Sequence, residues 1–339
     1  MPLYGTPTLA FPTKWCFHYR FMKIEDCGER CFVVVYRFSL CYNNKIKWGK
    51  GDFMKVKDIL SLDKPSLSFE VFPPKTQDKF EVVSRAAIKI AQLKPDFMSV
   101  TYGAGGTTAK YTVEVAKGIL DEGITPLAHL TCVNSTKESI LEKLSAFKDN
   151  GVENILALRG DIPQGATASA WDFTYANELV SFIKENGDFC VGGACYPEKH
   201  VESEREIDDL HNLKRKVDAG CDFLTTQMFF DNDLFYKFLL RVRNIGITVP
   251  VIPGIMPVTN GRQIKRSCEL SGAVLPDKFK RIVERFSDDP KAMEQAGIAY
   301  ATEQIIDLFA NGINAVHVYS MNKPHVAQKI KENLSEIFR

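Results

Sequence analysis

The sequence has almost no net charge and no long apolar run. Lys and Arg together number 43 and Asp and Glu number 42, which gives a formal net charge of +1 over 339 residues. This balance argues against a nucleic-acid-binding protein and against strong attraction to a membrane. No run approaches the roughly 20 apolar residues of a membrane-spanning helix. We therefore expect small molecules, and not nucleic acids or lipids, as the partners of this chain.

Paired cysteines are also missing. The nine cysteines are an odd number and show no paired metal-ligand spacing, so we interpret them as reduced thiols of a cytoplasmic protein. Cys132, Cys190, Cys195 and Cys221 stand in or beside predicted strands, where buried thiols mostly serve packing. His129 lies close to Cys132, but two ligands without further partners are a weak signal, and we expect no metal site.

The usual nucleotide fingerprints are absent as well. The glycine-rich stretch 103–106 does not fit the pattern G-x-G-x-x-G, and no P-loop lysine follows it. A glycine-rich turn lets the backbone approach a ligand closely, but it also simply makes a tight turn. Taken alone, this stretch therefore indicates little.

What the chain has is eight short apolar runs, each ending in a polar residue or a glycine. They cover residues 67–72, 97–102, 126–131, 155–161, 189–197, 223–227, 251–257 and 315–319. Helical spacing of apolar residues fills stretches between them, for example 78–94, 136–149, 205–219 and 290–310. Strand followed by helix, repeated eight times over about 250 residues, predicts an α/β fold, a closed (β/α)8 TIM barrel. A doubly wound open sheet is the alternative, and it is less favoured because the units follow one another without a clear break.

In a TIM barrel the catalytic groups collect where the strands end. The residues at those ends are Glu70, Thr101, His129, Asp161, Tyr196, Gln227 and Tyr319. Side chains alternate along a strand, so Glu70 shares one face with Ser68 and Phe72. Desolvation on an inner face raises the pKa of a carboxyl, which suits a general acid. The alternative for Glu70 is a carboxylate paired inside the core.

The helix predicted at 205–219 carries a polar side. Asp209, Asn212, Arg215 and Lys216 lie three, three and one residues apart and share one face of the helix. A solvated surface is the ordinary interpretation of such a face. Mixed charges together with an Asn would also suit a nucleotide with ribose hydroxyls and a pyrophosphate.

The first 53 residues differ in composition from the rest. They hold 12 of the 37 aromatic residues and four cysteines, and no strand or helix period is sustained. Residues 32–36 could form one strand, which Arg37 interrupts. Met54 then opens a stretch that looks like an ordinary bacterial N-terminus. We interpret 1–53 as an atypical extension from a mis-assigned start, with an accessory segment as the alternative, and 54–339 as the barrel domain.

The ordered motifs resemble those of the methylenetetrahydrofolate reductase family, in its short bacterial form without a regulatory domain. The likeness runs from about Ser66 to the end of the chain, and the first 53 residues have no counterpart in it. It rests on residues 68–74, 101–104, 129–131, 158–161, 194–198, 212–216, 226–231 and 253–257. Eight motifs in this order make the resemblance highly specific.

The resemblance implies a TIM barrel that binds FAD at the C-terminal ends of its strands, without a Rossmann fold. The FAD-binding positions that it implies are Thr101, Tyr102, Ala104, His129, Arg159, Gly160, Asp161, Tyr175, Ala176, Tyr196, His200, Asp209, Asn212, Arg215 and Lys216. The implied substrate-binding positions are Gln227, Gln263, Tyr319 and Lys323. The family often has Arg in place of Lys323, and Lys keeps the charge but lacks the bidentate fork.

The resemblance also implies a reaction. FAD would take hydride from NADH or NADPH, with NADH favoured, and then reduce 5,10-methylenetetrahydrofolate to 5-methyltetrahydrofolate in a ping-pong mechanism that feeds methionine biosynthesis. Glu70 is the predicted acid, and Asp161 is the predicted charge beside the flavin; a homo-oligomer is expected. The alternatives are another flavin-dependent barrel oxidoreductase such as proline dehydrogenase, a pterin-binding transferase, and a non-catalytic ligand-binding barrel.

Overall fold

The chain divides into two units, Met1–Asp52 and Phe53–Arg339. The computed structural model describes residues 54–74, 76–102, 109–162 and 171–338, together with two strands near the N-terminus. These strands, β1 (Cys16–Lys23) and β2 (Phe32–Ser39), pair antiparallel, with Cys16 opposite Ser39. The expectation that Arg37 interrupts a single strand was therefore wrong. An antiparallel pair has at most one covered face, so a charged residue does not end the pairing.

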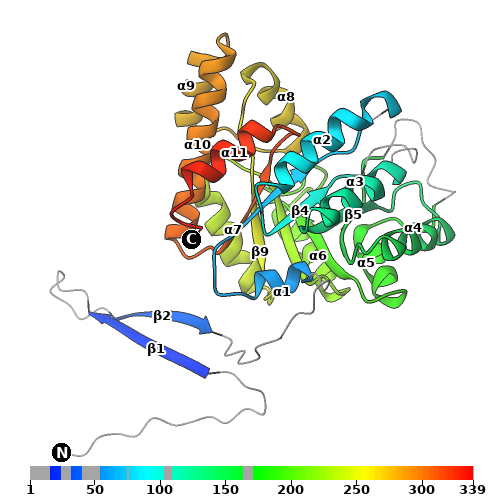
Figure 1. Ribbon diagram of the computed structural model, residues 1–339. Coiled ribbons are helices and arrows are strands. Elements are labelled where there is room, and N and C mark those ends of the chain that lie inside the picture. Colours follow the sequence, from blue (N-terminus) through cyan, green and yellow to red (C-terminus); the bar gives the residue numbers. More distant parts are fainter. Residues whose placement is uncertain are drawn as a thin grey trace, which may run out of the picture. The chain divides into compact units, whose positions relative to one another are not determined.

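Eight parallel strands close into a barrel in the second unit (Figure 1). They are β3 (Ser66–Val71), β4 (Phe97–Val100), β5 (Thr125–Thr131), β6 (Asn154–Leu158), β7 (Cys190–Cys195), β8 (Phe223–Met228), β9 (Val251–Ile255) and β10 (Ala315–Tyr319). β10 pairs with β9 on one side and with β3 on the other, which closes the ring. The predicted TIM barrel is thus confirmed, and the open sheet is excluded.

Helices form the layer outside the strands (Figure 1). They are α2 (Phe80–Ala91), preceded by the short 3-10 turn η1 (Gln77–Lys79), α3 (Ala109–Asp121), α4 (Lys137–Asp149), α5 (Ala176–Glu185), α6 (Glu206–Asp218), α7 (Asn232–Asn244), α8 (Gly261–Ser271), α9 (Asp277–Phe286), α10 (Pro290–Ala310) and α11 (Pro324–Asn333). The four helices expected from apolar spacing are all present. Their starts follow ordinary capping rules: Asp289 accepts backbone hydrogen bonds before α10, and Pro290 occupies its first turn.

The N-terminal end of the barrel is closed by a short helix, α1 (Val56–Leu60). Val56 and Ile59 are buried in a cluster with residues near the strand starts, among them Phe97 and Phe223. The backbone N–H of Val56 also donates to Oδ1 of Asn154, over 2.8 Å. α1 therefore acts as the floor of the barrel.

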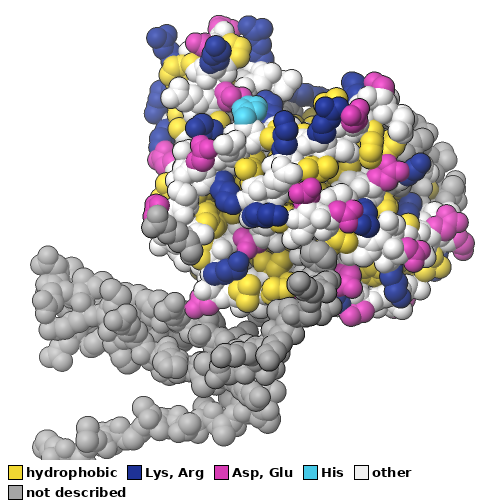
Figure 2. Space-filling view, in the orientation of Figure 1, with side chains coloured by type: hydrophobic (Ala, Val, Ile, Leu, Met, Phe, Trp, Pro, Cys, Tyr) yellow, Lys and Arg dark blue, Asp and Glu magenta, His cyan; other side chains and the backbone are white. Residues whose placement is uncertain are grey.

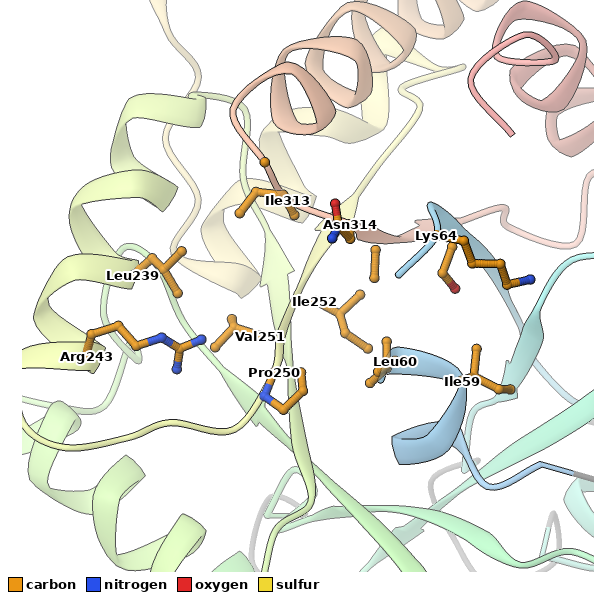
Figure 3. Close-up of a pocket in the computed structure, with 13 residues that line it drawn as sticks. Ile59, Leu60, Lys64, Leu239, Arg243, Pro250, Val251, Ile252, Ile313 and Asn314 are labelled. Carbon is orange, nitrogen blue, oxygen red and sulfur yellow. The ribbon is translucent and has the colours of Figure 1, made fainter. Parts of the chain in front are cut away.

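A cavity of about 140 Å³ lies at this N-terminal end (Figure 3). Ile59 and Leu60 of α1 stand on one side of it, and Leu239 and Arg243 of α7 on the other. Arg243 donates through one guanidinium nitrogen to the backbone carbonyls of residues 247 and 249, in the loop that follows α7. The cavity is small and its walls are mostly apolar.

One irregularity in the barrel bears on a predicted site residue. β8 and β9 pair in register up to Thr225, and pairing resumes only at Met228 opposite Gly254. Two residues of β8, including Gln227, therefore stand opposite the single residue Pro253. Proline has no N–H to offer the ladder, which accounts for a bulge here. The bulge changes the direction in which Gln227 leaves the strand.

The cysteines predicted to serve packing are all buried. Burial raises the pKa of the Cys132 thiol to about 11 and that of Cys190 to about 12. The protein surface drawn in Figure 2 carries basic and acidic side chains interspersed, in keeping with the net charge of +1. Among the described residues, none of the helices combines the length and hydropathy needed to cross a membrane.

The role of α1 as the floor generates a prediction about truncation. Removal of residues 1–53 is expected to leave a folded barrel, because the eight barrel strands and α1 all lie beyond that point. Removal of residues 1–61 should lower the midpoint of thermal unfolding by roughly 5–10 °C, since it exposes the apolar surface that Val56 and Ile59 cover. Differential scanning calorimetry of both truncations checks this. Equal destabilisation of the two forms would show that residues 1–53 contribute to barrel stability.

Candidate active site

A cluster of buried polar side chains stands on the inner face of the barrel. Oε2 of Glu70, on β3, accepts a hydrogen bond from the hydroxyl of Ser99, on β4, over 3.3 Å. Nε2 of His129, on β5, lies 3.5 Å from the same oxygen, and Nε2 of His317, on β10, lies 3.9 Å from it. Three side chains from three other strands thus meet around the carboxylate of Glu70.

His317 is tied to two serines. The hydroxyl of Ser68 donates to the carbonyl of Val316 over 3.0 Å, so it accepts from Nδ1 of His317 over 2.7 Å. Nε2 of His317 lies 3.0 Å from the hydroxyl oxygen of Ser99. The imidazole is only 2% exposed, and its ring stacks on Phe97. Its proton arrangement is therefore set by two hydroxyls.

His317 was missed in the sequence analysis, although a signal for it was present. It stands two residues before Tyr319 in the last strand, so alternation places it on the same inward face. A histidine at such a position near the end of a barrel strand deserved the same weight as His129.

The expected rise in the pKa of Glu70 was wrong. Burial does act to raise it, but hydrogen bonding toward His317, the proximity of His129 and the Ser99 hydroxyl outweigh burial, and the pKa lies below its ordinary value. Burial lowers the pKa of His129 to about 4, despite the attraction of Glu70. His129 is thus neutral near pH 7, and the ionised Glu70 is supported mainly by Ser99 and His317. The direction of the pKa shift of Glu70 is decided by neighbours from other strands, which the sequence pattern does not reveal.

Beside this cluster lies a large cavity of about 990 Å³, at the C-terminal ends of β4 to β7. All of the predicted FAD-binding residues in the described part of the chain line it. These are Thr101, Tyr102, His129, Arg159, Gly160, Asp161, Tyr175, Ala176, Tyr196, His200, Asp209, Asn212, Arg215 and Lys216. Ala104 lies outside the described residues. The polar face of α6 therefore borders this cavity as well as solvent.

The cations of the cavity are held differently from one another. Arg159 makes two hydrogen bonds, of 2.5 and 2.7 Å, to the carboxylate of Glu202. Arg215 donates to Asn212, and Lys216 donates to the carbonyl of Ala194. Neither makes an ion pair with a carboxylate of the described residues. Both are thus free to balance an anionic group, whereas Arg159 is already neutralised.

Lys143, on α4, also lines the cavity, and it was missed in the sequence analysis. Its ammonium donates to the hydroxyl of Ser135 over 3.3 Å and lies 5.6 Å from the centroid of the Tyr102 ring. Burial lowers its pKa. Only the fold brings this residue to the mouth, because helical spacing alone does not say how high on the barrel a lysine stands.

Two buried polar atoms at the cavity have no hydrogen-bond partner in the described structure: Nε2 of His129 and the hydroxyl of Tyr102. Both residues line the cavity, and buried polar atoms normally find a partner. A nucleotide cofactor with a polar ring edge would supply one. The donor set, the unpaired cations and the volume of the cavity therefore fit FAD.

The predicted substrate-binding residues lie on the other side of the mouth. The hydroxyl of Tyr319 donates to the carbonyl of Thr226 over 2.5 Å, passing so close to Gly254 that a Cβ there would lie 2.4 Å from the oxygen. Lys323 donates to the hydroxyl of Thr259 over 2.6 Å. The phenol of Tyr319 is thus engaged with the barrel backbone.

Gln263 and Gln227 complete that side. Gln263 is exposed in the first turn of α8, a few residues after Thr259. The Oε1 atom of Gln227 accepts from the backbone N–H of Met228, over 2.9 Å. The structure records no contact that joins the four predicted substrate residues to one another. No three His, Cys, Asp or Glu side chains gather in a metal-binding arrangement within the described ranges.

A TIM barrel whose mouth combines a buried acid–imidazole cluster with a nucleotide-sized cavity defines an enzyme that acts on small molecules. The methylenetetrahydrofolate reductase family model matches residues 55–335. The chain belongs to the methylenetetrahydrofolate reductase family.

Individual relatives agree with this assignment. The chain is 35% identical over 270 residues to 5,10-methylenetetrahydrofolate reductase of Escherichia coli K12, covering 79% of this chain and 90% of that protein. It is 36% identical over 298 residues to methylenetetrahydrofolate reductase (NADH) 1 of Arabidopsis thaliana, covering 84% of this chain and 50% of that protein. The chain therefore spans about half the length of this plant relative.

A solved structure shares the fold. It is an uncharacterized protein from Clostridium thermocellum that binds two copies of 5-methyl-5,6,7,8-tetrahydrofolic acid, with a TM-score of 0.58. The identity is 16%, and the match covers 84% of this chain and 99% of that one. At this identity the likeness concerns the fold alone.

The neutral His129 generates a prediction for stability against pH. Its pKa falls from 6.5 to about 4 on folding, so below pH 6.5 the unfolded chain takes up a proton that the folded chain refuses. Stability should therefore drop as the pH falls from 6.5 to 4, by an amount on the order of 2–3 kcal/mol. The depressed pKa of Glu70 acts in a separate window, below its ordinary value of 4.5.

Thermal unfolding from pH 4 to 8 measures this effect. His129→Asn should flatten the slope between pH 4 and 6.5, while His211→Asn, at an exposed position on α6, should leave it unchanged. The same slope in wild type and His129→Asn would mean that the histidine is not held neutral.

Proposed function

We propose that this protein reduces 5,10-methylenetetrahydrofolate to 5-methyltetrahydrofolate, with FAD as cofactor and NADH or NADPH as electron donor. The observation that carries the proposal is the position of Glu70: it is a buried carboxylate 3.5 Å from His129, which itself lines the nucleotide-sized cavity. Membership of the family and the folate reductase names of its relatives support the same substrate. The plant relative carries NADH in its name, which favours NADH as the donor.

The cofactor would be held by the cavity side of the mouth. FAD supplies hydride transfer when bound, accepting from the nicotinamide and donating to the folate in two separate half-reactions. Arg215 and Lys216 would balance the pyrophosphate, since neither is paired with a described carboxylate, and Asp209 and Asn212 would reach the ribose. Ala104 stays a predicted contact.

Glu70 is the proposed proton donor to the folate. Opening of the methylene bridge needs a proton on a weakly basic nitrogen. A carboxyl group with a lowered pKa is mostly ionised near pH 7, so by itself it rarely carries that proton. The neighbouring imidazole resolves this difficulty, because a proton is able to move between His317 and Glu70 through Ser99.

The hydrogen bonds of Ser99 support a relay with two states. Ser99 has one hydroxyl proton, which goes either to Glu70 or to Nε2 of His317. When Glu70 is ionised, Ser99 donates to it and accepts from Nε2 of His317. When Glu70 is protonated, it donates to Ser99, which donates to Nε2 of His317. The proton would shift between Glu70 and His317 through the hydroxyl of Ser99, while Ser68 accepts from Nδ1 in both states.

The substrate side would be formed by Gln227, Gln263 and Lys323. Lys323 and Gln263 approach the same loop, between β9 and α8, and both are suited to polar groups of the folate. Tyr319 would position the site through its bond to Thr226. We further propose a cytoplasmic homo-oligomer that supplies methyl groups for methionine biosynthesis; native mass spectrometry measures the assembly.

The acid assignment is tested by Glu70→Gln. The amide cannot supply a proton, so folate reduction should fall by about 10²–10⁴-fold. Reduction of the bound flavin by NADH should stay within a few-fold of wild type, because that step needs no proton from Glu70. Stopped-flow flavin absorbance measures the two half-reactions separately.

Glu303→Gln, at an exposed position on α10, is the matched control and should leave both half-reactions unchanged. If Glu70→Gln slows both half-reactions equally, Glu70 is structural. A wild-type protein that oxidises NADH with menadione but does not reduce methylenetetrahydrofolate would point to another flavin-dependent barrel oxidoreductase.

The proposed role of Asp161 concerns the charge beside the flavin. Asp161 lines the cavity and follows Gly160, whose φ of 86° is left-handed. Asp161→Asn removes a negative charge, so the reduction potential of the bound flavin should rise and hydride delivery to folate should slow. Spectroelectrochemical titration measures the potential. An unchanged potential would place Asp161 away from the flavin ring.

A further inference from the structure

The turn after β10 leaves the barrel abruptly, next to the proposed acid. Tyr319 pairs with Glu70 in the β10–β3 ladder. Beyond it, Met321 and Asn322 both have left-handed backbone, with φ of 54° and 52°, and the N–H of Lys323 closes the turn on the carbonyl of Ser320. The backbone of β10 thus turns away before it pairs with Phe72.

Side chains of this turn continue the ladder in place of the backbone. The hydroxyl of Ser320 donates to the carbonyl of Glu70 over 2.6 Å. The carboxamide of Asn322 accepts from the N–H of Phe72 and donates to its carbonyl, each over 2.9 Å. Asn322 therefore satisfies both backbone groups of Phe72, as an adjacent strand would.

This arrangement fixes the face on which Phe72 stands. On the opposite edge of β3, the N–H of Thr101 donates to the carbonyl of Val71, so the backbone groups go on alternating between the two neighbouring strands. Alternation places the side chain of Phe72 on the same face as Glu70, two residues farther toward the mouth. Pro73 and Pro74 follow and restrict the backbone after it.

The phenyl ring of Phe72 is unusually exposed for a large apolar side chain of the barrel. Phe72 is 37% exposed, although most large aromatic side chains of the barrel are buried. Two consecutive left-handed residues without glycine are uncommon, and such backbone persists where the surroundings enforce it, often at functional sites. A partly exposed phenyl ring on the face of the acid, carried by a backbone whose N–H and carbonyl are both bonded, is suited to contact with a flat ring of a ligand.

We propose that Phe72 stacks on the planar aromatic part of the folate that adjoins the nitrogen protonated by Glu70, and that Asn322 is the residue that positions it. This inference rests on the proposed function, since it names a contact of the same substrate. Phe72 thereby helps to determine substrate affinity, and Asn322 acts through Phe72.

Substitutions of Phe72 test the stacking. Phe72→Ala should raise the KM for methylenetetrahydrofolate and the Kd for 5-methyltetrahydrofolate by about 10-fold, the loss expected for one aromatic contact. Phe72→Tyr keeps the flat ring and should stay within twofold of wild type, with Phe72→Leu in between. Flavin content and flavin reduction by NADH should be unchanged in all three. A KM and a Kd that stay within twofold in Phe72→Ala, or equal slowing of both half-reactions, would overturn the stacking.

Asn322→Gly tests the positioning. Glycine adopts left-handed backbone without strain but removes both bonds to Phe72, so the folate KM should rise with little change in the unfolding temperature. The double variant Phe72→Ala/Asn322→Gly should be no worse than Phe72→Ala alone, because the two residues act in series. Additive losses would show that Asn322 does not act through Phe72.

Binding of 5-methyltetrahydrofolate, measured by calorimetry, separates this inference from the proposed function. A wild-type protein that binds it without catalysing folate reduction would overturn the reaction while leaving the Phe72 contact to be judged from Kd. A wild-type protein that does not bind it would overturn both.

Discussion

Parallel pairing of β10 with β3 is the constraint on which the rest of the mouth depends. It closes the ring and puts the last strand of the barrel beside the first. The register places His317 opposite Ser68 and Tyr319 opposite Glu70. A shift by one residue would turn each side chain to the other face of the sheet. The acid–imidazole cluster is thus a consequence of barrel closure between segments about 250 residues apart in the chain.

The pairing of β10 with β3 also explains why polar side chains are tolerated inside the barrel. Glu70, Ser99 and His317 would each be costly if buried alone, because an unpaired polar group in the interior loses its hydration. Together they satisfy one another, with Ser68 passing the chain of bonds on to the carbonyl of Val316. His129 is the exception in this cluster, because its Nε2 is buried and has no hydrogen-bond partner among the described residues. His129 is therefore available for a hydrogen bond to a ligand, whereas Glu70, Ser99 and His317 already bond to one another.

Much of this arrangement was predictable from the sequence, for a physical reason. Period-two alternation and helical spacing are local, so they specified the eight strand–helix units, and in a barrel the strand ends must converge. That logic correctly brought Thr101, His129 and Tyr196 to one cavity. The strand ends also singled out Asp161, and helical spacing singled out the polar face of α6 with Asp209, Asn212, Arg215 and Lys216. The other predicted cofactor residues were implied by the family resemblance, and all but the undescribed Ala104 line the same cavity.

What could not be predicted depends on contacts between distant segments. The sign of the pKa shift at Glu70 is set by His317, and the neutralisation of Arg159 is set by Glu202 in another loop. Lys143 reaches the mouth from a helix, and the two strands of the N-terminal unit pair with each other although residues 24–31 separate them in the chain. None of these has a local signature, because each needs the register or the height of an element in the fold.

The mouth divides into two sides that meet at Glu70. The large cavity occupies the C-terminal ends of β4 to β7. Tyr319 and the turn that holds Phe72 lie instead where β10 pairs with β3, and Lys323 extends from there to the loop after β9. His129 borders the cavity and lies 3.5 Å from Glu70, so it is the side chain common to both sides. Because it is kept neutral, it transmits no fixed charge between them, and its unpaired nitrogen stays available for a hydrogen bond. Under the proposed function, hydride transfer on the cavity side would then leave the proton of Glu70 for the folate side.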